Sequence, residues 1–301
     1  MGRPDGEAPE VNVHAAWRLV LAERAAQVYA SNEKLAALTV SGSVGTGRAD
    51  RFSDLELDCY WFTPPGEADR LDPIHRLGGE LEVIWDYDSG EEEWSDDYRL
   101  GELDVTVSNF LVSTIDRFLD DVILRTDTDP VKHMRLAALQ RCRPLYGAEL
   151  IKTWRARAAV YPETLVAAVA EQSLGQHVLT GWGARDALAY RRDDLAIHDL
   201  LTRIEHAVFG AVLALNHIYM PHRLIKWQLS LIGELEVMPE QFTDRLQLLW
   251  TSGSAEALRQ AETLMTDTIE LVRARTDADI GSFCEGLSER RRAVDPPFAA
   301  P

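Results

Sequence analysis

Residues 40–58 read VSGSVGTGRADRFSDLELD, a glycine-rich turn that leads into an acidic extended segment. Glycine has no Cβ, so the backbone at Gly42 and the glycines after it can approach an anion closely. Ser43 adds a hydroxyl group and Arg48 adds a fixed positive charge. The stretch therefore predicts a turn that binds phosphate.

Three carboxylates follow this turn, at Asp54, Glu56 and Asp58. Alternation along an extended strand places them on one face, with Leu55 and Leu57 on the other. Like charges on one face repel each other, and a divalent cation with oxygen ligands is the usual compensation. Mg²⁺ binds through one or two carboxylates plus substrate phosphates, which suits the turn upstream. A glycine-rich turn followed by a half-exposed acidic strand without a ligand is the alternative.

Gly42-Ser43, followed by Ser53-Asp54-Leu55-Glu56, resembles the signature of polymerase-beta-type nucleotidyltransferases. The Asp-x-Glu form is similar to that of the kanamycin-type enzymes, bacterial proteins that modify antibiotics. The resemblance is close over about 20 residues and loose over most of the chain. It implies that Ser43 contacts the terminal phosphates of a nucleotide, and that Asp54 and Glu56 are catalytic metal ligands for Mg²⁺.

Members of this family usually supply a third carboxylate from a later strand, as a metal ligand or as the base that activates the acceptor hydroxyl. Asp104 is the candidate for either role, because it lies in the extended stretch 102–107, on the face opposite Leu103 and Val105. A solvated residue on a strand edge is the alternative interpretation. Asp58 is the second candidate for the third carboxylate.

Outward from this stretch, the expected secondary structure changes near residues 112–125. The preceding part is mixed, with a helix expected from residue 13 and strands expected at 38–41, 56–62, 81–85 and 103–107. The following part reads as successive helices. These are expected at 114–121, 130–140, 148–158, 162–190, 194–219, 221–233, 239–249 and 255–275.

The pattern predicts an α+β protein with two domains. Residues 1–120 are expected to form a mixed-sheet catalytic domain, and residues 121–301 an all-helical domain that clamps the nucleotide or substrate. This layout agrees with the resemblance.

One segment of the helical part, residues 215–227, resembles an Asn-x-x-Tyr-x-Pro and Lys-Trp pattern of bacterial nucleotidyltransferase-like proteins. Arg223 and Lys226 are three residues apart, so on a helix they share a face and could both reach a triphosphate. Asn216 and Tyr219 have two open interpretations, as residues lining the same cleft or as helix-capping and packing residues.

The acidic segment 91–98, EEEWSDDY, also has two interpretations. It is either a solvated loop or a lip that holds a polyamine-like acceptor, because an aromatic side chain between carboxylates can stack on a cation.

Bulk composition narrows the class of function. The formal net charge is −18, which disfavours a broad nucleic-acid surface and favours cationic partners. No long apolar run or secretory signal is present, so we expect a cytoplasmic protein without a membrane span. Three widely spaced cysteines indicate core thiols. A homodimer is compatible with these features.

The leading hypothesis is a Mg²⁺-dependent enzyme that moves a nucleoside monophosphate, AMP from ATP or its equivalent from another NTP, onto a hydroxyl of a small molecule. The net acidity suits a cationic antibiotic such as an aminoglycoside. One alternative is the same chemistry on a protein or RNA, as in toxin and antitoxin members of the fold. Another is a nucleotide-binding module without catalysis.

Overall fold

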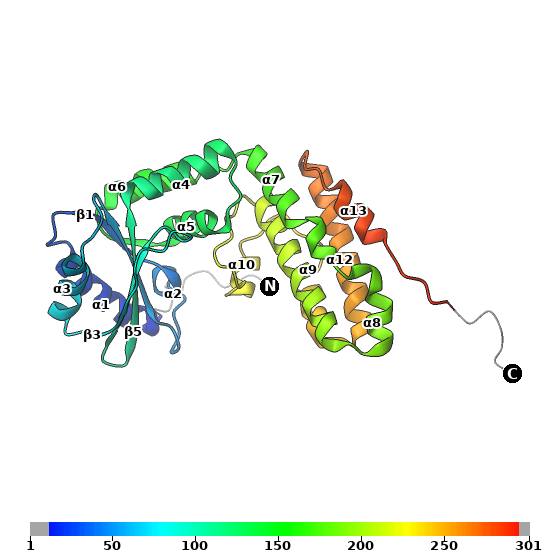
Figure 1. Cartoon of the computed structure of the whole chain (residues 1–301), viewed down its shortest axis with the longest axis horizontal. Coiled ribbons are helices and arrows are strands. Elements are labelled where there is room, and N and C mark those ends of the chain that lie inside the picture. The colour runs from blue at the N-terminus through cyan, green and yellow to red at the C-terminus, as the bar shows by residue number, and fades with distance from the viewer. Residues whose placement is uncertain (1–11, 295–301) are drawn as a thin grey trace, which may run out of the picture. The chain divides into compact units, whose positions relative to one another are not determined.

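The computed structural model describes residues 12–294 of the 301-residue chain (Figure 1). The chain divides into two compact units. The first runs to Val160 but excludes Thr126–Pro130, which belongs with the second unit from Tyr161 onward. The predicted boundary at residue 120 falls inside a helix, and the first unit continues past it.

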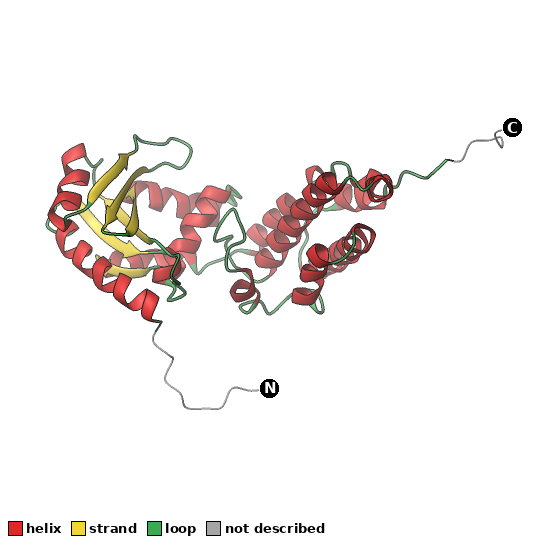
Figure 2. Ribbon diagram, turned by 90° about the horizontal axis from the view of Figure 1, so that it is seen from below, coloured by secondary structure: helices red, strands yellow, loops and turns green. Residues whose placement is uncertain are grey.

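The first unit contains a six-stranded sheet and the helices that flank it, and Figure 2 shows that the strands of the chain lie in this unit. Its elements are α1 (Val13–Tyr29), β1 (Leu35–Val40), α2 (Gly42–Gly45), β2 (Leu55–Trp61), α3 (Glu67–Leu77), β3 (Glu80–Ile84), β4 (Trp94–Leu100), β5 (Leu103–Leu111), α4 (Val112–Arg125), α5 (Pro130–Arg141), β6 (Arg143–Tyr146) and α6 (Ala148–Ala158). The strand order is β3-β4-β5-β2-β1-β6. Strands β2 and β5 run parallel, and the other neighbouring pairs are antiparallel.

Strand β2 presents two different faces. Leu55, Leu57 and Cys59 are buried in a core that they share with α1 and α3. Alternation turns Glu56, Asp58 and Tyr60 to the other face. There the Tyr60 ring packs against Trp154 of α6, at 5.0 Å between centroids. The end of this face near Tyr60 is therefore covered by helices.

The second unit is helical. Its elements are α7 (Glu163–Ser173), two 3₁₀ turns (Gln176–Leu179 and Trp182–Ala184), α8 (Arg185–Arg191), α9 (Asp194–Leu215), α10 (Gln228–Ile232), α11 (Phe242–Thr251), α12 (Ser254–Arg275) and α13 (Gly281–Ser288). Helix α9 is buried at every position from Ala207 to Leu215, so it is the central helix of this core. Among residues 12–294, no helix is long and apolar enough to cross a membrane.

The α+β class and the order of mixed sheet then helices are confirmed. Two helix predictions are wrong. The expected helix over 162–190 is interrupted after Ser173, where Gly175 opens a 3₁₀ turn and Gly181 has φ of 86°. The expected helix over 221–233 is reduced to α10, because Trp227 adopts a positive φ of 57° just before it.

Candidate functional site

The glycine-rich turn forms the short helix α2 between β1 and β2. The Ser41 N–H donates to the Glu56 carbonyl at 2.9 Å, which ties the start of the turn to β2. The end is tied to α1, because the Asn12 side-chain amide donates to the carbonyls of Gly47 and Ala49 at 2.9 and 2.8 Å. The turn is therefore held at both ends by hydrogen bonds.

Gly42 has φ of 57°, a conformation that favours glycine. A Cβ at this position would lie 1.4 Å from Oε2 of Glu56. The Glu56 carboxylate therefore occupies the space that a side chain at position 42 would fill. Two residues predicted to act together, one for phosphate and one for metal, are adjacent in space.

The carboxylates of Asp54, Glu56 and Asp58, in β2 and directly before it, have different surroundings. Asp54 is exposed and, within residues 12–294, makes no hydrogen bond or ion pair. Glu56 is half-buried. Asp58 is buried, where it accepts hydrogen bonds from the hydroxyls of Ser41 and of Thr39. Burial raises the pKa of Asp58. Asp58 thus has a structural hydrogen-bonding role beneath the turn.

Asp104 lies on the same face of the sheet as Glu56. The parallel register pairs Glu56 with Thr106, and Asp104 is two residues before Thr106 on β5. Asp104 is exposed, and its side chain has no hydrogen bond or ion pair in the described part of the chain. Between residues 12 and 294, no three His, Cys, Asp or Glu side chains are grouped so that they could hold a metal ion. The role of Asp104 stays a prediction.

Ser43 and Arg48 belong to the same turn. The Arg48 N–H donates to the Ser43 carbonyl at 2.8 Å, so the two residues lie at opposite ends of one tight loop. Both are partly exposed. The structure thus brings Gly42, Ser43 and Arg48 into one turn, with Glu56 against its first residue.

A partly buried polar cluster beside this face was not predicted. Glu93, just before β4, forms a hydrogen bond with Ser108, the register partner of Asp58. Nη2 of Arg135 on α5 lies 2.9 Å from Oε2 of Glu93. Burial raises the pKa of Glu93 to about 7, and the nearby Asp58 carboxylate adds to the rise. The sequence carried little signal for this cluster, because Glu93 lies in a run of three glutamates.

The acidic segment has its charges partly neutralised. Glu92 forms an ion pair with Arg117, and Glu91 lies 3.9 Å from Arg135. The rings of Tyr87 and Trp94 pack at 4.7 Å. An aromatic pair is therefore present, but the carboxylates beside it already have arginine partners.

Arg223 and Lys226 belong to the second unit and lie in the loop between α9 and α10, not on a helix. The prediction that Arg223 and Lys226 share one face of a helix is therefore wrong. Both side chains are exposed. Asn216 and Tyr219 have packing roles, because Tyr219 is fully buried and the Asn216 side chain bonds to backbone groups.

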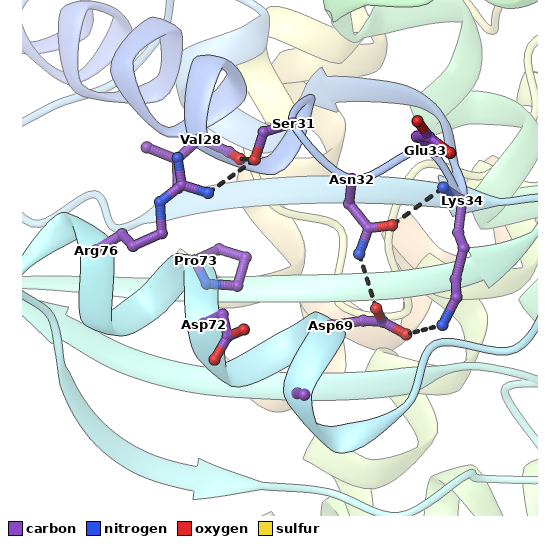
Figure 3. A pocket seen from close by; sticks show the side chains of 10 residues that line it. Val28, Ser31, Asn32, Glu33, Lys34, Asp69, Asp72, Pro73 and Arg76 are labelled. Carbon is purple, nitrogen blue, oxygen red and sulfur yellow. Dashed lines mark hydrogen bonds and ion pairs between the residues drawn. The ribbon is translucent and has the colours of Figure 1, made fainter.

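A cavity of about 440 Å³ lies elsewhere on the first unit (Figure 3). In it, the Lys34 ammonium and the Asn32 amide both contact Asp69, at 2.7 and 2.8 Å. The Arg76 guanidinium donates to the Ser31 hydroxyl. None of the predicted site residues lines this cavity. It is therefore separate from the face that carries Asp54 and Glu56.

Comparison with known proteins identifies no family for this chain. No protein-family model matches the sequence, and no curated protein matches it. One similar solved structure is a nucleotidyltransferase-like protein from Exiguobacterium sibiricum 255-15, with 13% sequence identity and a TM-score of 0.41. The match covers 88% of this chain and 78% of that chain. A likeness at this TM-score does not bear on the site residues.

Proposed function

We propose that this chain is a Mg²⁺-dependent nucleotidyltransferase. Its substrates are an NTP, ATP in the simplest case, and a small molecule with a reactive hydroxyl. The observation that carries the proposal is the contact between the backbone of Gly42 and the carboxylate of Glu56. It joins a turn suited to phosphate with a strand suited to a divalent cation.

The donor set suits Mg²⁺. Asp54 and Glu56 offer carboxylate oxygens, and Asp54 is exposed with no partner in residues 12–294. Asp58, the third acid of the run, is occupied by Ser41 and Thr39. Two carboxylates plus phosphate oxygens are a usual ligand set for this ion. When bound, Mg²⁺ would neutralise part of the phosphate charge.

The residues of the chain would then have distinct tasks. The turn at Gly42 and Ser43 would hold the terminal phosphates, with Arg48 adding positive charge. Asp104 would accept the proton of the acceptor hydroxyl. The hydroxyl oxygen would form a bond to the α-phosphorus as the bond from that phosphorus to the pyrophosphate oxygen breaks. The products would be pyrophosphate and a nucleotidylated acceptor.

The charge of the chain favours a cationic acceptor. There are 49 acidic against 31 basic residues, so an amine-bearing molecule would be attracted and an RNA repelled. An aminoglycoside-like antibiotic has this chemistry. The acceptor class rests on charge alone.

The decisive experiment compares wild type with Asp54→Asn. Pyrophosphate release is measured with each NTP and a panel of hydroxyl-bearing amines, and mass spectrometry detects an added nucleotide. We expect activity that requires Mg²⁺ and is lost in Asp54→Asn, with an unchanged melting temperature because Asp54 is exposed. Calorimetry with a non-hydrolysable NTP separates an enzyme from a binding module. A fully active, magnesium-independent Asp54→Asn protein would contradict the assignment of Asp54 as a metal ligand of a nucleotidyltransferase.

A further inference from the structure

The cavity of about 440 Å³ on the first unit has one wall from the end of α1 and the turn after it, and another from α3 (Figure 3). Small-molecule sites have volumes of roughly 300–1,000 Å³, so the cavity is large enough for such a ligand. Pro73 lines it from within α3. Because proline has no N–H, Pro73 cannot donate the helical hydrogen bond to the carbonyl of Asp69. The α3 wall therefore offers an apolar ring and a carbonyl without its usual helical donor.

Five ionisable side chains line this cavity, three acidic and two basic: Glu33, Lys34, Asp69, Asp72 and Arg76. Lys34 and Asp69 neutralise each other at 2.7 Å. Glu33 and Asp72 are exposed and make no hydrogen bond or ion pair within residues 12–294. Two acidic groups and one basic group remain, with a sum of −1. A ligand that balances them carries one more positive charge than negative charges.

The opposite charges on α3 are kept apart. Asp72 and Arg76 are four residues apart on this helix, a spacing at which Asp and Arg commonly form an ion pair. The Arg76 guanidinium instead donates to the Ser31 hydroxyl at 2.7 Å, and it has no carboxylate partner in the described part of the chain. In Figure 3 the guanidinium and the Asp72 carboxylate lie on either side of the Pro73 ring. The cavity thus presents separate positive and negative groups with an apolar ring between them.

We propose that this cavity binds a cationic amino acid, with the carboxylate of the ligand on Arg76 and its two ammonium groups on Asp72 and Glu33. A guanidinium has five N–H donors, so Arg76 keeps donors for a carboxylate beside its bond to Ser31. The methylene groups of the ligand pack on the Pro73 ring. The ligand's net charge of +1 balances the −1 of the cavity. This site is independent of the proposed function, because none of the predicted site residues lines the cavity.

The probe is L-lysine, titrated into the full-length protein by calorimetry at neutral pH and fixed salt, beside two analogues. Cadaverine lacks the carboxylate of lysine, and norleucine lacks its side-chain ammonium group. We expect wild type to bind lysine about tenfold or more tightly than either analogue, because each analogue loses a charged hydrogen bond.

Two variants test the charged groups. Arg76→Met should weaken lysine binding about tenfold or more and leave cadaverine binding unchanged, because only lysine has a carboxylate. Asp72→Asn should weaken the binding of both. Arg24→Met is the matched control, because Arg24 is exposed on α1, has no partner within residues 12–294 and does not line the cavity. It should bind lysine as wild type does.

Ser31→Ala separates a structural role of Arg76 from a binding role. It removes the internal hydrogen bond and keeps the guanidinium, so it should still bind lysine. The proposal is overturned if wild type does not bind lysine or binds both analogues equally well. It is also overturned if Arg76→Met and Asp72→Asn both bind lysine as wild type does, or if Ser31→Ala loses binding as Arg76→Met does.

Discussion

The Cα of Gly42 and the carboxylate of Glu56 are in contact, so that a methyl group at position 42 would coincide with Oε2 of Glu56. The two residues come from α2 and β2, which are consecutive along the chain. Their contact means that the identity of residue 42 controls where the Glu56 carboxylate lies.

Gly42→Ala should displace the Glu56 carboxylate and abolish Mg²⁺-dependent transfer. The clashing atom is the far end of a flexible side chain, so the fold should lose only the ~1–2 kcal/mol of a left-handed alanine. Gly47→Ala is the matched control, because Gly47 has φ of 72° and a Cβ there meets nothing within 4 Å. Urea unfolding and pyrophosphate release are measured for both. Wild-type activity in Gly42→Ala would remove Glu56 from the site.

Asp104→Asn should lower kcat far more than it lowers nucleotide affinity. Asp104 is on the face of Glu56, and a residue that activates the acceptor acts mainly in the transition state. Steady-state kinetics and NTP titration give the two quantities separately. Normal turnover in the variant would transfer the role to another residue.

Arg70→Met should destabilise the first unit strongly. The Arg70 side chain is 6% exposed and that of Asp96 is 1% exposed, and Nε of Arg70 donates to Asp96 at 3.2 Å. Removing one partner leaves a buried charge, which costs ~3–5 kcal/mol. Arg99→Met breaks the exposed pair with Glu82 and should cost ~1 kcal/mol or less. Equal losses in the free energy of unfolding would contradict the burial of the Arg70 pair.

Glu93 should make the stability of the protein fall as pH rises. Its pKa is raised from 4.5 to about 7, so between these values the folded state binds more protons than the unfolded state. The slope of the unfolding free energy with pH is therefore negative in this window, and the full shift corresponds to ~3 kcal/mol. Glu93→Gln should be more stable than wild type above pH ~8 and similar below pH ~4.5. Urea unfolding at both pH values measures the difference, and an equal difference at both would exclude a titrating Glu93.

Much of the secondary structure of the first unit could be predicted from the local sequence pattern. The sequence pattern placed Leu55 and Leu57 on the strand face opposite Glu56. The sheet has this arrangement, because the face of β2 that carries the two leucines packs on α1 and α3. Strand β4 was missed, since WSDDYRL is polar at most positions and lies in a segment rich in acidic residues. Pairing with β5 and the contact of buried Arg70 with Asp96 stabilise β4, and Arg70 lies 26 residues before Asp96, beyond a local window.

The sequence allowed candidate site residues to be named within one continuous stretch, and it gave less information about residues elsewhere in the chain. Gly42 and Glu56 are in contact, and their joint role in a site stays a prediction. The cluster at Glu93 depends on Arg135, which is far away in the chain, so spacing could not reveal it. In the second unit, the spacing of Arg223 and Lys226 suggested a helix, whereas a loop brings the two cations near His222.

The pairing of β6 with β1 has a consequence for the protein during its synthesis. As the nascent chain emerges, β1 can pair with β2, but its other edge has no partner until residues 143–146 follow. An open strand edge is a template for association with other chains. A fragment that stops at residue 120 would carry Asp54, Glu56 and Asp104 and still expose this edge, so an isolated first unit should extend to Val160 to remain monomeric in solution.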